Sequence, residues 1–242
     1  MQIDFYEEFP TKENLQKLKL IKYPIRLFVA TKSIEEFKGL EKRVKQLKKD
    51  TKVAYWPIIR NSYWISPFSN TKDLINLFRK LDSIKNHLLI DLEMPKNKTM
   101  MLKNILSFFK NKSIIRRFME ENKQRITTAQ PIETIFSRYI QIRGQNFNIK
   151  TEKSFMWYTS MLPNKINKIV KRKLNYIKNK EDYSISLGTI AYGILGNEPI
   201  LSPKNLEKDL QFVKRTGFNK VIIFRLGGLN KEYIKVINKF QN

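Results

Sequence analysis

Short apolar runs recur along the chain, separated by longer amphipathic stretches. Each run is five or six residues long and rich in aliphatic, aromatic or β-branched side chains, which is typical of strands. The pattern predicts eight strands, over residues 2–7, 26–30, 53–58, 88–93, 125–129, 155–160, 183–187 and 221–225.

Between the predicted strands, apolar residues recur at the spacing of one helix face. One helix is predicted over residues 33–49, with Ser33 as its N-cap and Glu36 three residues later. Another is predicted to begin at Ser202-Pro203 and to end near Gly217. Further helices are predicted over 70–81, 164–179 and 230–240.

Eight strands alternating with helices in 242 residues predict an α/β fold, a (β/α)₈ TIM barrel, as a single domain over residues 1–242. The alternative is a doubly wound open sheet, which usually has a glycine-rich turn after its first strand. Here that strand ends in Glu7-Glu8-Phe9-Pro10, without glycine. Residues 131–152 form the longest irregular segment, which we expect to be a helix and a loop over the barrel mouth.

Carboxylates stand near the ends of two predicted strands. A TIM barrel forms its active site at the carboxyl ends of its strands. Asp91 and Glu93 share one face of strand 88–93, and the other face is purely apolar, so both acids are expected to point into the barrel. Glu7 and Glu8 end the first strand, and alternation does not decide which of them faces inward.

Aromatic and polar side chains follow the other strands. Acids among aromatic rings suggest glycoside chemistry, since two carboxyl groups cleave a glycosidic bond and flat rings cover the C–H faces of sugars. We take Asp91, Glu93, Glu7 and Glu8 as candidate catalytic residues. The candidate substrate-binding residues are Tyr55, Trp56, Trp64, Gln130, Trp157, Tyr158, Tyr192 and Arg225.

Structural roles stay open for several of these residues. The strand-four acids could pair with Arg225 or a lysine, and the tryptophans could close the barrel mouth by packing. His87, the only histidine, stands at the other end of strand four and is expected to be structural. Gly227-Gly228 after strand eight is a weak phosphate-binding signal.

Composition narrows the chemistry. The absence of cysteine excludes disulfides, thiolate nucleophiles and Cys-ligated zinc. With a single histidine, a Ser-His-Asp triad and a zinc site are poorly supported, so no metal and no cofactor are expected, although acids at the strand ends could also hold a divalent cation. No apolar stretch is long enough to span a membrane. MQIDFYEEFP has no signal-peptide pattern, which leaves both a cytoplasmic and a mature secreted protein open.

The formal net charge of +25 allows a nucleic-acid or other anionic partner. The lysines spread along the whole chain, which favours solvated surface lysines over a dedicated nucleic-acid face.

Two segments resemble a known family. LLIDLE (88–93) resembles the end of the fourth-strand signature of chitinase-like glycoside hydrolases, a run of spaced acids closing in Asp-x-Glu, and FMWYTSM (155–161) resembles their sixth-strand Met-x-Tyr motif. The resemblance implies a (β/α)₈ barrel that acts on N-acetylhexosamine glycans, with Glu93 as general acid. Asp91 would orient the substrate acetamido group, which attacks the anomeric carbon, and Tyr158 would hold that group.

The favoured function is therefore a glycoside hydrolase that cleaves a glycan or cell-wall polysaccharide. A strand-one glutamate acting as nucleophile or base is an alternative to the acetamido group. Two other functions stay open: a barrel that binds glycans without cleaving them, and a basic protein that binds nucleic acid or a phosphate ester. The sequence does not predict the oligomeric state.

Overall fold

The computed structural model describes residues 1–59, 62–93, 98–132 and 144–241. Eight parallel strands close into a barrel in chain order, and β1 pairs with β8. The strands are β1 (Gln2–Glu7), β2 (Arg26–Thr31), β3 (Lys52–Pro57), β4 (Leu88–Asp91), β5 (Ile126–Pro131), β6 (Glu152–Met156), β7 (Tyr183–Gly188) and β8 (Lys220–Phe224). The predicted (β/α)₈ TIM barrel is confirmed.

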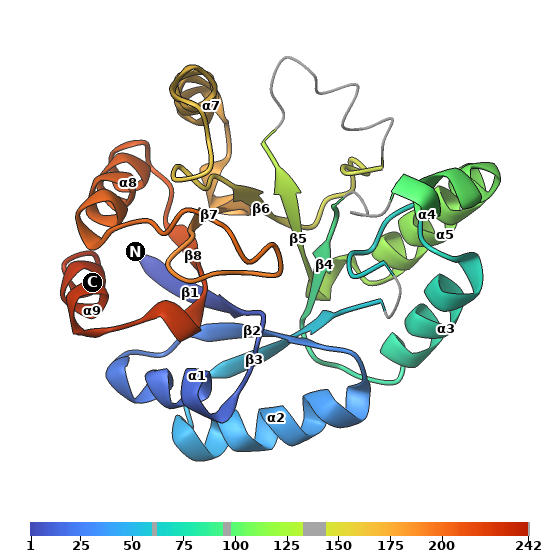
Figure 1. The fold of residues 1–242 in the computed structure, drawn as a ribbon, viewed down its shortest axis with the longest axis horizontal. Helices are drawn as coiled ribbons and strands as arrows, with labels where there is room; N and C mark the ends of the chain where they lie inside the picture. The colour runs from blue at the N-terminus through green and yellow to red at the C-terminus, as the bar shows by residue number, and fades with distance from the viewer. Residues whose placement is uncertain (60–61, 94–97, 133–143, 242) are drawn as a thin grey trace.

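Helices surround the barrel on its outer side (Figure 1). They are α1 (Lys12–Gln16), α2 (Ile34–Leu47), α3 (Thr71–Leu81), α4 (Lys98–Lys103), α5 (Phe108–Glu121), α7 (Asn164–Tyr176), α8 (Pro203–Arg215) and α9 (Lys231–Asn238). The predicted N-caps of α2 and α8 are present: Ser33 accepts a hydrogen bond from the backbone N–H of Glu36, and Ser202 accepts one from that of Asn205.

Three helices, α1, α4 and α5, lie where no helix was predicted. Helix α5 buries Ile115, Phe118 and Met119 against the rest of the protein, and the ring of Phe118 stacks on Phe78 of α3 with centroids 4.2 Å apart. The segment 131–152, predicted as a helix and a loop, lies largely outside the described residues.

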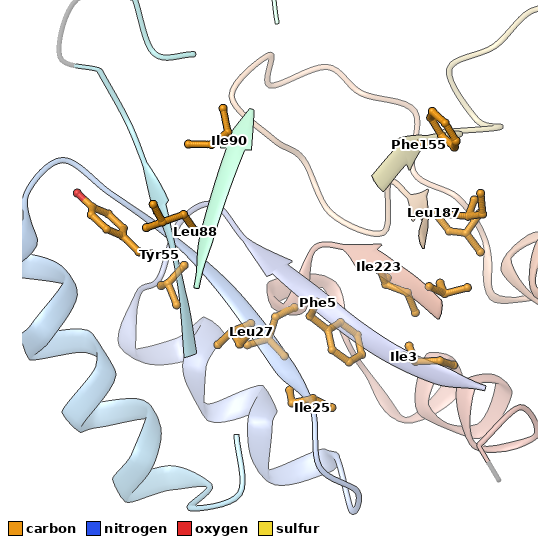
Figure 2. Close-up of a cluster of buried hydrophobic side chains, with 14 of the residues drawn as sticks. Ile3, Phe5, Ile25, Leu27, Tyr55, Leu88, Ile90, Phe155, Leu187 and Ile223 are labelled. Atoms are coloured by element: carbon orange, nitrogen blue, oxygen red, sulfur yellow. The ribbon is translucent and has the colours of Figure 1, made fainter. Parts of the chain in front are cut away.

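Two apolar layers hold the fold together, and alternation along each strand separates them. The outer layer lies between strands and helices and includes Phe5 of β1, Leu27 of β2, Ile90 of β4 and Ile223 of β8, which Figure 2 labels. Leu88 and Leu92 also belong to it, as predicted for the apolar face of strand four. The layer inside the barrel consists of Tyr6, Phe28, Ala30, Ala54, Trp56, Leu89, Ala129, Ile222 and Phe224.

The end of the barrel opposite the strand carboxyl termini is closed by polar contacts. Arg26 of β2 pairs with Glu152 of β6 at 2.8 Å, and His87 Nε2 lies 2.8 Å from Thr127 Oγ1. Burial and the nearby Arg26 lower the pKa of His87 to about 4, so its ring is neutral at pH 7. This setting agrees with the structural role predicted for His87.

Strand six differs from its prediction. It was predicted over 155–160, but β6 is Glu152–Met156, because its polar first residues pair with β5 in the register Thr127↔Glu152 to Pro131↔Met156. The chain leaves the sheet after Met156, so the aromatic pair that follows lies beyond the strand.

Candidate active site

A cavity of about 390 Å³ lies at the carboxyl ends of the strands. Its floor is the inner layer of the barrel, with Tyr6, Leu89 and Phe224 among the lining residues. Its walls come from residues that follow the strands, and from the loop between β7 and α8. Figure 1 shows this loop, in orange, lying over the strand ends. The cavity therefore occupies the position where TIM barrels form their active sites.

Asp91 and Glu93 both line the cavity, as the alternation along strand four predicts. Asp91 is the last residue of β4 and is only 5% exposed, and its Oδ1 has no hydrogen-bond partner among the residues that the structure describes. Burial raises the pKa of Asp91 well above its ordinary value, and the charges of Glu93 and Glu8 raise it further, while a hydrogen bond from Trp56 opposes the shift. Asp91 therefore binds a proton much more readily than an exposed aspartate.

Glu8 is the strand-one glutamate that lines the cavity. The hydroxyl of Tyr63 donates a short hydrogen bond to its Oε1. Burial is the main cause that raises the pKa of Glu8, with a smaller contribution from Glu198, and the bond from Tyr63 acts in the opposite direction. Alternation left open which of Glu7 and Glu8 faces inward. In the structure it is Glu8 that lines the cavity.

Glu7 lies outside the cavity in a closed polar network. Its buried carboxylate pairs with Arg225 Nη1 at 2.9 Å and accepts hydrogen bonds from the backbone N–H groups of Phe9 and Gly227. Burial raises the pKa of Glu7 to about 7, although Arg225 and the backbone donors lower it. The network joins β1 to the segment after β8, and neither Glu7 nor Arg225 lines the cavity, where Arg225 was expected.

Three predicted aromatic residues, Trp56, Trp64 and Tyr158, line the cavity. Trp56 points inward from β3, and its ring packs against Tyr6 with centroids 5.7 Å apart. Tyr158 packs against Phe224, with centroids 5.8 Å apart. Burial raises the pKa of Tyr158 well above its ordinary value, and the acids of the cavity raise it further, so its hydroxyl keeps its proton and can donate a hydrogen bond.

Two further aromatic residues predicted in the cleft point away from it. Tyr55 alternates with Trp56 on β3 and stacks on Phe37 of α2, with ring centroids 4.7 Å apart. Trp157 is fully buried between barrel and helices, where its Nε1–H donates to Asn167 of α7 at 2.8 Å. Neither side chain lines the cleft in which it was predicted. Tyr55 points outward because the period of two sends every second strand side chain to the helix side, and Trp157 follows the end of β6 and is held by α7.

Gln130 and Tyr192 also lie outside the cavity lining. Gln130 is buried on the outer side of β5, where its Oε1 accepts a hydrogen bond from Thr128 at 3.3 Å. Tyr192 is 55% exposed, and its carbonyl oxygen accepts a hydrogen bond from Arg225 Nε at 2.9 Å. Neither side chain joins the acids in the cavity.

Sequence reasoning missed Glu198, a fourth carboxylate of the cavity. It belongs to the loop between β7 and α8, which also contributes Ile194 and Leu195 to the lining. Its Oε1 accepts a hydrogen bond from the backbone N–H of Leu195 at 3.0 Å, and no described residue forms a hydrogen bond with its Oε2. The available signal was its place in a loop after a strand, which is where TIM barrels carry functional residues.

The described residues offer no group of three or more His, Asp or Glu side chains arranged to hold a metal ion. Within the same residues, no helix combines the length and apolarity needed to cross a lipid bilayer.

Similar folds occur among solved structures. A chitinase from Rhizomucor miehei aligns over all of both chains with a TM-score of 0.56 and 11% identity. A chitinase from Chromobacterium violaceum aligns over 100% of this chain and 99% of its own, with a TM-score of 0.55 and 8% identity. The PgaB (BpsB) glycoside hydrolase domain from Bordetella bronchiseptica aligns over 97% and 95%, with a TM-score of 0.54 and 11% identity.

No family model matches the sequence, and a search of curated proteins finds no match. At these identities the structural similarity concerns the fold alone. The chain therefore has a TIM barrel like those of chitinases and of a glycoside hydrolase domain. Its chemistry has to be inferred from its own residues.

Proposed function

We propose that the protein is a glycoside hydrolase that cleaves a glycan by carboxylate acid–base catalysis. The observation that carries this proposal is the joint position of Asp91 and Glu93 in a cavity lined by Trp56, Trp64 and Tyr158. Paired carboxyl groups catalyse cleavage of a glycosidic bond, and aromatic rings pack on the C–H faces of sugars. The glycoside hydrolase fold of the similar structures agrees with this assignment.

Glu93 is the proposed general acid. It follows β4, is less buried than Asp91, and lies nearer to the open end of the cavity. Burial, and after it the charge of Glu93, raises the pKa of Asp91, so a proton is held readily beside Glu93. In the reaction, Glu93 donates this proton to the glycosidic oxygen as the bond to the anomeric carbon breaks.

Positive charge develops at the anomeric carbon as this bond breaks, and a second group must stabilise it. In the substrate-assisted route that the chitinase resemblance implies, Asp91 orients an acetamido group of the substrate, which attacks the carbon, and Tyr158 donates a hydrogen bond to it. In a two-carboxylate route, Glu8 acts as nucleophile or base, and Tyr63 fixes its orientation. Where the acetamido group or Glu8 is the nucleophile, water then hydrolyses the intermediate and returns a proton to Glu93. Where Glu8 is the base, it takes the proton of the attacking water itself.

Substitution of Glu93 by Gln tests the proposal. Gln keeps the shape of the side chain but has no acidic proton, so we expect cleavage of N-acetylglucosamine oligomers or bacterial cell-wall glycans to fall by about 10²–10⁴-fold. Product formation is measured by mass spectrometry with each glycan that the wild type cleaves.

The control is Glu120→Gln, which alters an exposed glutamate of α5 that pairs with Arg116 and is expected to leave cleavage unchanged. If Glu93→Gln retains full activity on every glycan that the wild type cleaves, Glu93 is not the acid and the proposal fails. A wild type that binds these glycans without cleaving any of them would instead support a binding protein.

A further inference from the structure

The cavity has an unusual charge composition for this chain. The protein has 47 lysine and arginine residues against 22 acidic ones. The described residues that line the cavity nevertheless include four carboxylates and no lysine, arginine or histidine. The four are Glu8, Asp91, Glu93 and Glu198.

Glu8 and Glu198 form a close pair within this set. A Cβ atom placed on Gly193 would lie 2.8 Å from Glu8 Oε2 and 2.8 Å from Glu198 Oε1, so the two oxygens are at most twice that distance apart. A side chain at Gly193 would contact both carboxylates, so the glycine leaves the space between them and this residue open. Each glutamate is 5% exposed.

The pair has little positive charge beside it. Arg225 and the backbone N–H of Ile194 lower the pKa of Glu8, but the guanidinium of Arg225 is already paired with Glu7. One oxygen of Glu8 is held by Tyr63 and one of Glu198 by the backbone of Leu195, while Oε2 of each has no hydrogen-bond partner among the described residues. Asp91 Oδ1 is in the same condition. Buried carboxylate oxygens without a cation or a donor are costly, and a cation brought by a ligand would offset that cost.

The ligand must therefore bring positive charge and hydrogen-bond donors into a cavity that also has apolar and aromatic walls. A protonated amine on a sugar ring has these properties, since the ammonium group supplies three donors and the ring C–H face packs on aromatic side chains. A metal ion fits less well, because the described residues contain no group of three or more His, Asp or Glu side chains arranged to hold one.

We infer that the cavity binds glycans with unacetylated hexosamine residues, and that Glu8 and Glu198 together bind the ammonium group of one such residue. This inference rests on the proposed function, because it names the substrate class of the same site. An N-acetylated sugar at that position has no charge to offer, and it would leave the two carboxylates unpaired.

Binding of two matched oligosaccharides tests the inference. The probes are the tetramers of glucosamine and of N-acetylglucosamine, titrated calorimetrically into Glu93→Gln so that turnover is suppressed. We expect the glucosamine tetramer to bind about tenfold tighter or more, because only its ammonium group can form charge-assisted hydrogen bonds with the two carboxylates. Adding Glu198→Gln should remove about tenfold of that preference, while Glu120→Gln should leave it unchanged.

Equal binding of the two tetramers, tighter binding of the acetylated one, or a preference that survives Glu198→Gln would overturn the inference. Thermal unfolding shows whether each variant is folded, and Glu8→Gln replaces Glu198→Gln if the latter does not fold.

Cleavage by the wild type separates this inference from the proposed function. A protein that cleaves the acetylated tetramer and shows no preference for the amine is a hydrolase without the proposed ammonium site. A protein that binds the glucosamine tetramer through Glu198, yet cleaves neither tetramer nor any partly acetylated mixture of them, has the ammonium site but is not a hydrolase.

Discussion

Asp91 is a residue whose position works against the stability of the fold. It is buried, one of its oxygens lacks a hydrogen-bond partner in the described part of the chain, and the charges of Glu93 and Glu8 act against its ionisation. Such an arrangement is expected where a carboxyl group has a chemical task, because function tolerates a local loss of stability.

Substitution of Asp91 by Asn should therefore stabilise the protein at pH 7 while abolishing cleavage. Asn has nearly the same shape and no charge to bury, so we expect a gain of about 1–3 kcal/mol in the free energy of unfolding. Since the pKa of Asp91 is raised in the folded state, the wild-type residue disfavours folding more as pH rises above the unfolded value of 3.8. The gain should therefore be small at pH 4 and larger at pH 8.

Urea denaturation at the two pH values measures this difference. Asp50→Asn, at an exposed position, serves as the matched control and is expected to change stability by no more than about 0.5 kcal/mol. A loss of stability in Asp91→Asn at pH 8 would mean that the carboxylate is held by favourable contacts, and its proposed role would lose its main physical support.

Among the elements, β1 and β8 close the barrel, and the ion pair between Glu7 and Arg225 links the ends of these strands. Replacing Arg225 by Ala should lower the free energy of unfolding by about 3–5 kcal/mol, because it leaves a buried carboxylate without its cation. Lys239→Ala removes an exposed partner of Glu207 and should change it by about 0–1 kcal/mol. If urea denaturation gives the same small value for both, the pair does not hold the strands together.

The period of two along the strands explains what could be predicted at this scale. It placed Asp91 and Glu93 inside the barrel and Leu88, Ile90 and Leu92 outside, because one face of β4 is purely apolar. Applied to β3, the same rule separates Trp56, which lines the cavity, from Tyr55, which packs on α2. Where both faces carry aromatic or polar side chains, the composition of the strand does not indicate which face is inside.

Loop conformation could not be predicted in this way. Glu198 lines the cavity from the loop between β7 and α8, where Gly193 leaves the space beside two carboxylates open. Glu7 and Glu8 are neighbours in sequence, yet tertiary contacts with Arg225 and Tyr63 give them different surroundings. These contacts join residues far apart in the chain, and no local pattern encodes them.

On the scale of the whole molecule, the excess of positive charge coexists with several buried acidic side chains. The net charge is +25, whereas several acids are buried, among them Asp4, Glu7, Glu8, Asp91 and Asp209. Burial is the largest cause of a raised pKa in all five, which reaches about 7 for Glu7 and about 6 for Asp209. The interior therefore favours protonated carboxyl groups, and the surface repels further protons.

This division predicts how stability depends on pH. A carboxyl group whose pKa is raised in the folded state contributes most below its unfolded pKa, and this contribution is lost as pH rises through the folded pKa. For Glu7 the loss falls between pH 4.5 and about 7, and for Asp209 between 3.8 and about 6. His87 acts in the opposite direction, because its pKa falls from 6.5 to about 4 and its contribution is lost in acid.

Five acids outweigh one histidine, so the free energy of unfolding should decline from about pH 5 toward pH 8. Below about pH 4, protonation of exposed acids increases a net charge that is already +25, and repulsion should destabilise the fold again. Chemical denaturation across this range, repeated in high salt, distinguishes the two effects. Salt should weaken the acid-side loss, which arises between exposed charges, and leave the decline above pH 5, which arises from burial. Stability that instead rises steadily from pH 5 to pH 8 would mean that the buried carboxylates are paired within the fold, and a cationic ligand would have no unmet charge to neutralise.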